Sequence, residues 1–474
     1  MKKLFLCLMV ALGFGAFAQE TNDPMEALEQ RTTNLEESVR ILKKLKVSGY
    51  IQAQYQYAET DADGINFKLA NRANAYEAKE LESYGRFGIR RGRVKFTYEE
   101  GIASGVVQID VTDKGISGDR NVVTFKDVYL NVKDPWIGTC SFKAGIFDRP
   151  FGHEIAYSSS SRESPERARI IQSLFPDERD LGAMLTLQPA KTSGWNILKL
   201  EAGMFTGSGI KPQFDSHMDF IGHLSVTKVI GSNLTIGGGV SLYAGGILQT
   251  DSSVYKMKDD KFVLDSKSAD NIGKYAKRQY IGFDFQFGVT TAAGLTQLRA
   301  EYIFGEQPQN AAGSWDYKFM SLPTYETVVA KDADGNAIID PKTGEPTKKT
   351  TSVPVYMRKV SGGYVILTQD LGTLPLTAIV KYDWYNPNTE ISGNDVAVKG
   401  SGTVAKDLSM NNIGAGLMWR INQALRLTAY YDFVNNETTE NLKDTKNADG
   451  KITKYGWEGN RKDNVFTLRL QYKF

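Results

Sequence analysis

The chain ends in the stretch Val465-Phe466-Thr467-Leu468-Arg469-Leu470-Gln471-Tyr472-Lys473-Phe474, in which apolar and polar side chains alternate. A repeat of two residues indicates a β-strand with one apolar face and one polar face. A soluble β-sandwich and a membrane barrel both contain strands of this kind, so one strand does not decide between them. The pattern over the rest of the chain is needed to distinguish these two folds.

The same alternation recurs from residue 46 to the end of the chain. Each repeat is near the roughly 9 to 11 residues that a tilted strand needs to cross a bilayer. We predict about sixteen strands, at 46–57, 85–98, 104–112, 122–132, 139–146, 181–188, 196–204, 218–229, 233–243, 277–288, 295–304, 356–367, 375–385, 410–420, 424–433 and 463–474.

The connections between these strands alternate between short and long. The short ones are 99–103, 133–138, 189–195, 230–232, 289–294, 368–374 and 421–423. The long ones are 58–84, 113–121, 147–180, 205–217, 244–276, 305–355, 386–409 and 434–462. An outer-membrane barrel has short periplasmic turns and long outer loops, whereas a sandwich has no reason for this alternation. The sequence therefore predicts an all-β, transmembrane antiparallel barrel over 47–474, with both chain ends on the periplasmic side.

The first residues have the pattern of a secretory signal. Two lysines precede an apolar run, and Ala16-Phe17-Ala18 resembles a cleavage site, so we expect residues 1–18 to be removed. Cys7 raises the alternative of a lipoprotein, but Leu6 is too bulky for that processing site. Cleavage would leave Cys140 as the only thiol, so no disulfide within the chain is expected.

Residues 19–46 are predicted to form a periplasmic helix ahead of the barrel. Apolar residues recur there at alternating steps of three and four, at Met25, Leu28, Leu35, Val39 and Leu42. This stripe covers only about three heptads, the lower limit for a coiled coil, so a single amphipathic helix remains an equal alternative.

Composition and motifs argue against catalysis. The whole chain has 57 basic and 55 acidic residues, so bulk charge predicts neither a nucleic-acid partner nor any other. No nucleophile motif or phosphate loop is present. Of the 3 histidines, His217 and His223 share one strand region at even spacing, but no third metal ligand is evident. We expect no enzyme activity, cofactor or metal site.

Strand parity places basic side chains inside the barrel. In the second strand Val94, Phe96 and Tyr98 face outward, so Arg91, Arg93 and Lys95 face the lumen. The opposite parity would put these charges in lipid, at about 2 to 4 kcal/mol each near the midplane. The same argument places further basic and acidic residues inside: Lys143, Lys199, Arg299, Lys381, Arg420, Arg426, Arg469 and Lys473, with Asp110, Asp127, Glu201, Asp284, Glu301, Asp383 and Asp432.

These inward charges have two possible roles. They either contact solute or pair with one another in networks that hold the wall rigid. The long connection 147–180 adds five arginines and seven acidic residues in or beside it, and it would narrow the passage if it folds inward. The predicted field is therefore mixed, with basic side chains in moderate excess.

Several stretches resemble the phosphate-selective porin O and P family of outer-membrane channels. They are Arg90-Arg91-Gly92-Arg93, Phe125-Lys126-Asp127-Val128-Tyr129-Leu130, Ala144-Gly145-Ile146-Phe147-Asp148-Arg149-Pro150-Phe151-Gly152, Glu163-Ser164-Pro165-Glu166-Arg167-Ala168 and Asp177-Glu178-Arg179-Asp180-Leu181-Gly182. The resemblance implies a sixteen-strand homotrimer, an inward-folded third loop, and lumen arginines, Arg90, Arg91 and Arg93 among them, that contact anions. Where that family commonly has Lys-Glu before Pro-Phe, this chain has Asp148-Arg149, so phosphate specificity does not follow.

The sequence thus predicts a porin for passive diffusion, with a preference for anions such as phosphate or small carboxylates. The alternative is a structural or adhesive barrel whose long loops bind a partner. The predicted solute-contacting residues are Arg90, Arg91, Arg93, Lys95, Lys126, Lys143, Arg149, Arg162, Arg167, Arg169, Arg179, Arg299, Arg426 and Arg469.

Overall fold

The computed structural model describes residues 24–59, 84–111, 123–210, 215–313, 325–332, 335–341 and 345–474. The predicted signal peptide, 1–18, and the predicted loop 113–121 lie outside these residues.

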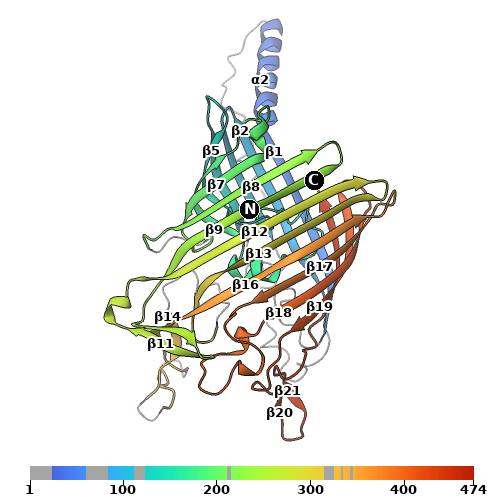
Figure 1. Cartoon of the computed structure of the whole chain (residues 1–474). Coiled ribbons are helices and arrows are strands. Elements are labelled where there is room, and N and C mark those ends of the chain that lie inside the picture. The colour runs from blue at the N-terminus through green and yellow to red at the C-terminus, as the bar shows by residue number, and fades with distance from the viewer. Residues whose placement is uncertain are drawn as a thin grey trace.

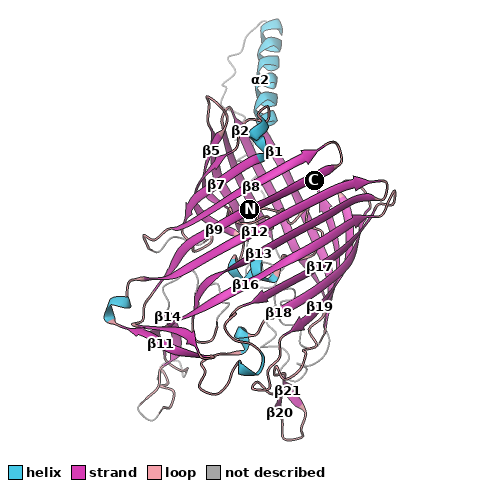
Figure 2. Ribbon diagram, viewed as in Figure 1, coloured by secondary structure: helices cyan, strands magenta, loops and turns pink. Residues whose placement is uncertain are grey.

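Sixteen strands form a closed antiparallel barrel, as predicted (Figures 1 and 2). The strands are β1 (Leu45–Ala58), β2 (Tyr84–Glu100), β3 (Ala103–Val111), β4 (Thr124–Lys133), β5 (Cys140–Asp148), β6 (Arg179–Leu187), β7 (Leu198–Phe205), β8 (Asp219–Ile230), β9 (Leu234–Leu248), β12 (Tyr275–Thr291), β13 (Gly294–Gln309), β16 (Val355–Asp370), β17 (Leu376–Asn386), β18 (Met410–Arg420), β19 (Leu425–Asn436) and β22 (Val465–Lys473). Each pairs with its neighbours in chain order, and β1 pairs with β22 to close the ring. Closure leaves no unpaired edge strand in the barrel.

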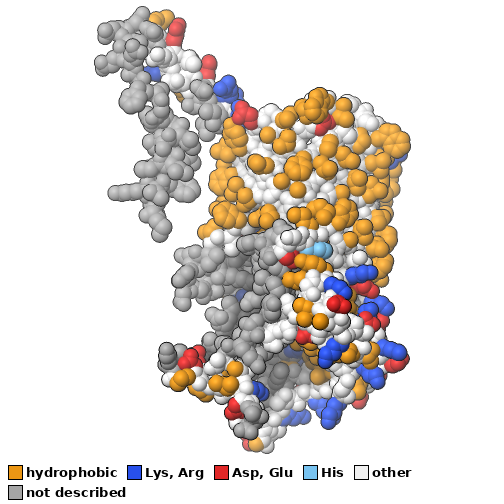
Figure 3. Space-filling model, turned by 90° about the vertical axis from the view of Figure 1, so that its left-hand side faces the viewer, with side chains coloured by type: hydrophobic (Ala, Val, Ile, Leu, Met, Phe, Trp, Pro, Cys, Tyr) orange, Lys and Arg blue, Asp and Glu red, His pale blue; other side chains and the backbone are white. Residues whose placement is uncertain are grey.

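The wall is apolar on its outside. Figure 3 shows hydrophobic side chains spread over the visible wall, with charged side chains gathered beyond it at the end that carries the long loops. Outward residues such as Phe283, Val380 and Leu470 are 47%, 52% and 44% exposed. The two-residue repeat explains this surface, because every second side chain of each strand points out. Among the described residues, none of the helices is both long enough and apolar enough to cross a membrane.

The N-terminal helix α2 (Pro24–Lys44) stands beyond the short-turn end of the barrel, where the C-terminus also lies (Figure 1). The helix confirms the predicted helical segment. An ion pair from Lys44, the last residue of the helix, to Glu100 of β2 ties its base to the rim, and Lys46 Nζ of β1 pairs with Glu99 Oε2 beside it at 2.9 Å. Whether the helix joins a coiled coil stays a prediction.

Three of the long connections contain strands that the sequence patterns did not predict. Their short hairpins are β10 (Ser253–Lys258) with β11 (Lys261–Lys267), β14 (Tyr325–Val329) with β15 (Lys348–Ser352), and β20 (Thr445–Lys446) with β21 (Ile452–Lys454). Short 3₁₀ helices add Gly194–Ile197, Ala269–Asn271, Gly393–Asp395 and Ala405–Asp407. Several long loops share a small core of Ile391, Val396 and Leu408, against which Met257 and Trp457 pack. The loop end is therefore an ordered surface with its own apolar contacts.

Candidate functional site

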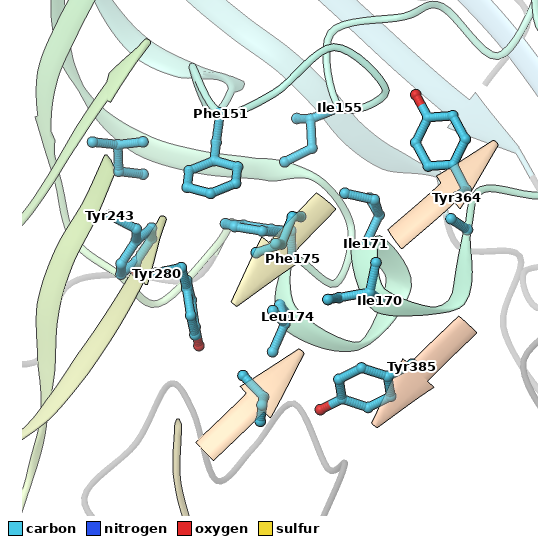
Figure 4. Close-up of a cluster of buried hydrophobic side chains, with 14 of the residues drawn as sticks. Phe151, Ile155, Ile170, Ile171, Leu174, Phe175, Tyr243, Tyr280, Tyr364 and Tyr385 are labelled. Carbon is cyan, nitrogen blue, oxygen red and sulfur yellow. The ribbon is translucent and has the colours of Figure 1, made fainter. Parts of the chain in front are cut away.

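The connection between β5 and β6 lies inside the barrel. We call residues 149–178 the inner segment; it contains the short helix α5 (Arg169–Leu174). Ile170, Ile171 and Leu174 of α5 are buried, as are Phe151 and Phe175 on either side of it. These side chains point toward aromatic residues of the wall in Figure 4. The labelled wall residues are Tyr243 of β9, Tyr280 of β12, Tyr364 of β16 and Tyr385 of β17.

Phe175 is the centre of this contact. Its ring lies 4.8 Å from that of Phe151, 5.9 Å from Tyr243 and 5.7 Å from Tyr280, measured between centroids. Gly282 of β12 leaves room for the neighbouring Phe151 ring, because a Cβ at this glycine would lie 2.7 Å from that ring. The barrel thus contains an apolar core of its own, which the sequence-based prediction missed by attending to the arginines of this connection.

The beginning of the inner segment is anchored on a carboxylate of β13. Glu301 Oε2 accepts hydrogen bonds from the backbone N–H of His153, at 3.3 Å, and of Glu154, at 3.1 Å. The N–H of Gly152 donates to Ser241 Oγ at 2.8 Å. Gly152 has φ of 61°, and a Cβ there would overlap the Glu301 carboxylate, so only glycine fits this turn.

The far side of the inner segment meets arginines of β2 and β22. Glu166 accepts a two-pronged bond from Arg90, with Nε to Oε1 at 2.7 Å and Nη2 to Oε2 at 2.8 Å. Arg91 Nη2 donates to Oε2 at 3.2 Å, and Arg469 Nη2 donates to Oε1 at 2.9 Å. Burial raises the pKa of the Glu166 carboxyl, but the charges of these three guanidinium groups outweigh burial and hold the pKa well below its ordinary value.

A β-bulge explains how two successive arginines reach the same carboxylate. Gln52 pairs with Arg91 and Ala53 pairs with Ile89, so Arg90 is an extra residue in β2. Strict alternation would have turned Arg90 toward the apolar outer face of the barrel. The adjacent arginines in an otherwise alternating strand were the available signal, because one of two neighbours must leave the pattern for both to avoid the apolar outer face.

Most of the other predicted solute-contacting residues also form ion pairs within the chain. The pairs are Arg93 Nε–Asp110 Oδ2 at 2.9 Å, Arg149 Nε–Asp180 Oδ2 at 3.0 Å, Arg179 Nε–Asp127 Oδ1 at 2.8 Å, Lys126 Nζ–Asp177 Oδ1 at 3.4 Å, Arg167–Glu178 and Arg299–Glu163. Lys126 is the extra residue of a second bulge, in β4. These cations are largely neutralised by carboxylates of the inner segment and the wall.

The remaining predicted cations form no ion pair with a described carboxylate. They are Lys95, Lys143, Arg162, Arg169 and Arg426. Lys143 Nζ lies 4.9 Å above the ring of Tyr129, a cation–π contact. Arg169 Nη1 lies 3.0 Å from the sulfur of Met410.

Arg162 and Arg426 lie together beside the Glu166 cluster. Arg426 Nη2 donates to the carbonyl oxygen of Arg162 at 2.8 Å. Within the described part of the chain, the buried Nε and Nη1 of Arg162 have no hydrogen-bond partner. Burial, followed by the charge of Arg167, lowers the pKa of Arg162 to about 10. Two guanidinium groups without an ion-paired carboxylate therefore lie here, with Arg162 buried and Arg426 partly buried.

A cavity of about 320 Å³ lies between the inner segment and the wall formed by β22 and β1 to β5, toward the short-turn end. Ser158, Ser159 and Ser160 line it from the inner segment, and Lys95 and Lys473 line it from the wall. Its lining is mainly polar, which suits a hydrated solute.

The two histidines considered as a metal pair make separate contacts. His223 Nε2 lies 2.9 Å from Asp284 Oδ2. His217 stacks on Tyr275 with ring centroids 4.0 Å apart. Across the described residues, no group of three or more His, Cys, Asp or Glu side chains is arranged to hold a metal ion.

Comparison of the sequence with models of protein families finds no match, and comparison with curated proteins finds none. Solved structures of similar fold include OmpT, an outer-membrane protein of Vibrio cholerae, in its trimer form, with 10% identity over 91% of this chain and 99% of that chain and a TM-score of 0.46. The outer-membrane channel DcaP of Acinetobacter baumannii has 12% identity over 91% and 97%, with a TM-score of 0.46. OmpF of Salmonella typhi, in complex with daunomycin, has the same identity, coverage and TM-score. At such identities a similar fold says nothing about solute or chemistry.

Proposed function

We propose that this protein is an outer-membrane porin through which small solutes diffuse passively, with a modest preference for anions. The observation that carries the proposal is a closed barrel with an apolar exterior and a charged interior, narrowed by the inner segment. An apolar outer face suits hydrocarbon, and inward charges require water or partners, so the arrangement fits a channel across a bilayer. Placing the short-turn end, α2 and the C-terminus in the periplasm follows the usual orientation of such barrels.

Anion preference rests on the cations left without carboxylate partners. Lys95 lines the cavity beside the inner segment, and Arg162 and Arg426 lie beside the Glu166 cluster. Phosphate and small carboxylates are the solutes whose oxygens guanidinium groups bind best. Because most lumen arginines are paired within the chain, we expect weak selectivity, with no strict dependence on phosphate.

The test is single-channel conductance of the purified protein in planar bilayers. A potassium chloride gradient should give a reversal potential of the anion-selective sign, and phosphate and succinate salts should conduct. Heat-denatured protein is the control for leaks. A clearly cation-selective reversal potential would contradict the anion preference, and the absence of discrete conductance steps would contradict the porin itself.

The second candidate is a structural or adhesive barrel that binds a partner through its loops. It is favoured by the small loop core around Val396 and by the inner segment, whose residues are largely buried inside the barrel. Liposome swelling with small sugars and organic anions separates the two candidates. Swelling supports the porin, and tight liposomes that contain folded barrel support the second candidate.

We also propose that the protein assembles as a homotrimer. Met25, Leu28 and Leu35 of α2 are 66%, 59% and 65% exposed, so this apolar stripe is available to copies of the same helix. Deleting residues 20–45 and measuring the mass in mild detergent tests whether α2 contributes. An unchanged trimer mass would remove α2 from the interface, and a monomeric full-length protein would refute the trimer.

A further inference from the structure

Glu166 sits in a site that is built like a receptor for a carboxylate. Arg90 donates two parallel N–H hydrogen bonds to the Glu166 carboxylate, which is the geometry by which guanidinium groups recognise free carboxylates. Arg91 of β2 and Arg469 of β22 approach the same two oxygens from the two strands that flank β1. The Glu166 side chain is 8% exposed and that of Arg90 is 34% exposed, so the carboxylate is buried while one of its arginines remains accessible to water.

The wall holds two of these arginines in place without help from Glu166. Arg91 Nη1 donates to Gln52 Oε1 at 2.9 Å, and Arg469 Nε donates to Gln54 Oε1 at 2.9 Å. Both glutamines belong to β1, a barrel strand. The site would therefore keep much of its shape if the Glu166 side chain left it, which is the preorganisation that a binding site needs.

The charges in this region do not balance. Three guanidinium groups share one carboxylate, and Arg162 and Arg426 add positive charge beside them. A purely structural ion pair needs one cation for each carboxylate, and every additional buried charge without a partner costs free energy. A site that also binds an anionic solute would account for the positive charges that Glu166 does not neutralise.

The backbone around Glu166 has anchors that do not involve its side chain. The N–H of Ala168 donates to Glu154 Oε2 at 2.9 Å, and the carbonyl oxygen of Pro165 accepts from Arg469 Nη1 at 2.6 Å. The apolar contacts of Phe175 lie with β9 and β12, away from β2 and β22 in the strand order. The side chain can thus exchange while the inner segment stays docked.

We propose that Arg90, Arg91 and Arg469 form a carboxylate-binding site, that Glu166 occupies it as a tethered ligand, and that a solute carboxylate replaces Glu166 as it passes. The inference rests on the proposed porin function and names its solute class. A tethered competitor makes the site available for only part of the time, and the apparent affinity for solute is the intrinsic affinity multiplied by that fraction of time. It therefore keeps the solute from remaining bound, as conduction requires.

The experiment measures block of chloride current by succinate in planar bilayers. Glu166→Gln keeps the shape of the side chain and removes the competing charge, so the succinate concentration that halves the chloride conductance should fall about tenfold. Glu163→Gln is the matched control, because it removes a carboxylate of the same segment whose partner is Arg299. This control should stay within about twofold of the wild type. Gel mobility without heating shows that each barrel is folded.

Three results would overturn the inference in a conducting protein. They are an unchanged half-blocking concentration in folded E166Q, an equal fall in E163Q, and a gain in affinity for phosphate without a gain for succinate. Should E166Q not fold, Glu166→Asp keeps the charge on a shorter arm and should give a smaller fall in the same direction. An increase or no change with E166D would count against the site.

The porin proposal and this inference fail in distinguishable ways. If the wild type gives no conductance steps, the porin fails, and calorimetric titration of succinate into detergent-solubilised E166Q then decides the binding site. Heat of binding in E166Q that is lost when Arg91→Gln is added to E166Q supports the site. The absence of any heat of binding in E166Q refutes it.

Discussion

Replacing Phe175 by alanine should loosen the inner segment while the barrel stays folded. The Phe175 side chain is fully buried and contacts three aromatic rings, two of them on the wall. A buried Phe→Ala substitution costs about 3 to 5 kcal/mol, from lost burial and from the cavity left behind. The hydrogen bonds between the sixteen strands do not involve this side chain. The substitution should therefore lower the free energy that holds the inner segment against the wall and leave the stability of the barrel unchanged.

Amide hydrogen exchange measures that cost directly. The N–H of Gln172 donates to the carbonyl oxygen of Ala168 and that of Phe175 to Ile171, at 3.1 and 2.9 Å, so both amides are protected while α5 is docked. Since about 1.4 kcal/mol is a factor of ten in an equilibrium constant, undocking should become at least about a hundredfold more frequent. Exchange at these two positions should accelerate by the same factor in Phe175→Ala.

Phe283→Ala is the matched control for this experiment. Phe283 lies on β12, three residues after Tyr280, but its side chain faces outward and is 47% exposed. Its loss should leave exchange in α5 unchanged. The reasoning is refuted if Phe175→Ala accelerates exchange in α5 by less than about tenfold, or accelerates it equally in the barrel strands.

Three further outcomes are expected. Asp180→Asn leaves the fully buried Arg149 without its carboxylate, so the free energy of unfolding in urea should fall by about 3 to 5 kcal/mol, and an unchanged midpoint and slope would contradict this. Gly152→Ala should accelerate exchange in the inner segment, because the added Cβ would overlap the Glu301 carboxylate. Gly101→Ala is the control: Gly101 has a similar positive φ of 57°, but nothing lies within 4 Å of the added Cβ, so exchange in the inner segment should not change. Equal effects of the two substitutions would mean that backbone strain alone is at work. Folding depresses the pKa of Glu166 below its ordinary value of about 4.3. The stabilisation that its carboxylate provides should therefore be fully present above about pH 4.3 and be lost only as the pH falls through the lower pKa of the folded state. The difference in unfolding free energy between wild type and E166Q should therefore be constant from about pH 8 to pH 5, and a decline within that range would be inconsistent with the depressed pKa.

The strands were predictable because their signals are local. The two-residue repeat marks each strand, and the alternation of short and long connections fixes their order around a ring. Predicted boundaries fell short mainly toward the long loops: the strand expected at 233–243 extends to Leu248, and the one expected at 295–304 extends to Gln309. Those extensions lack a continuous apolar face, so the pattern gives no reason to include them.

The partners of the lumen arginines were not predictable, because they come from distant parts of the chain. Glu166 is 76 positions from Arg90 and 303 from Arg469. Acidic residues of the connection 147–180 were visible in the sequence, but nothing local specifies which arginine each one meets. Strand parity gave the direction of Arg91 and Arg93 and failed at Arg90, where the bulge adds one residue.

The inner segment is held by two kinds of interaction, on two sides of the barrel. Toward β9 and β12 the contacts are apolar, and water offers Phe175 no alternative partner, so this side is expected to remain docked. Toward β2 and β22 the contacts are polar, and they include the hydrogen bonds that guanidinium groups donate to the Glu166 carboxylate and to the carbonyl oxygen of Pro165. In the proposed site, a solute carboxylate would accept the hydrogen bonds that Glu166 accepts. Opening a solute path along β1, β2 and β22 would break polar contacts, including those from Gln52 and Gln471 to the carbonyl oxygens of Ser159 and Ser160, whereas a path along β9 and β12 would require separating an apolar core.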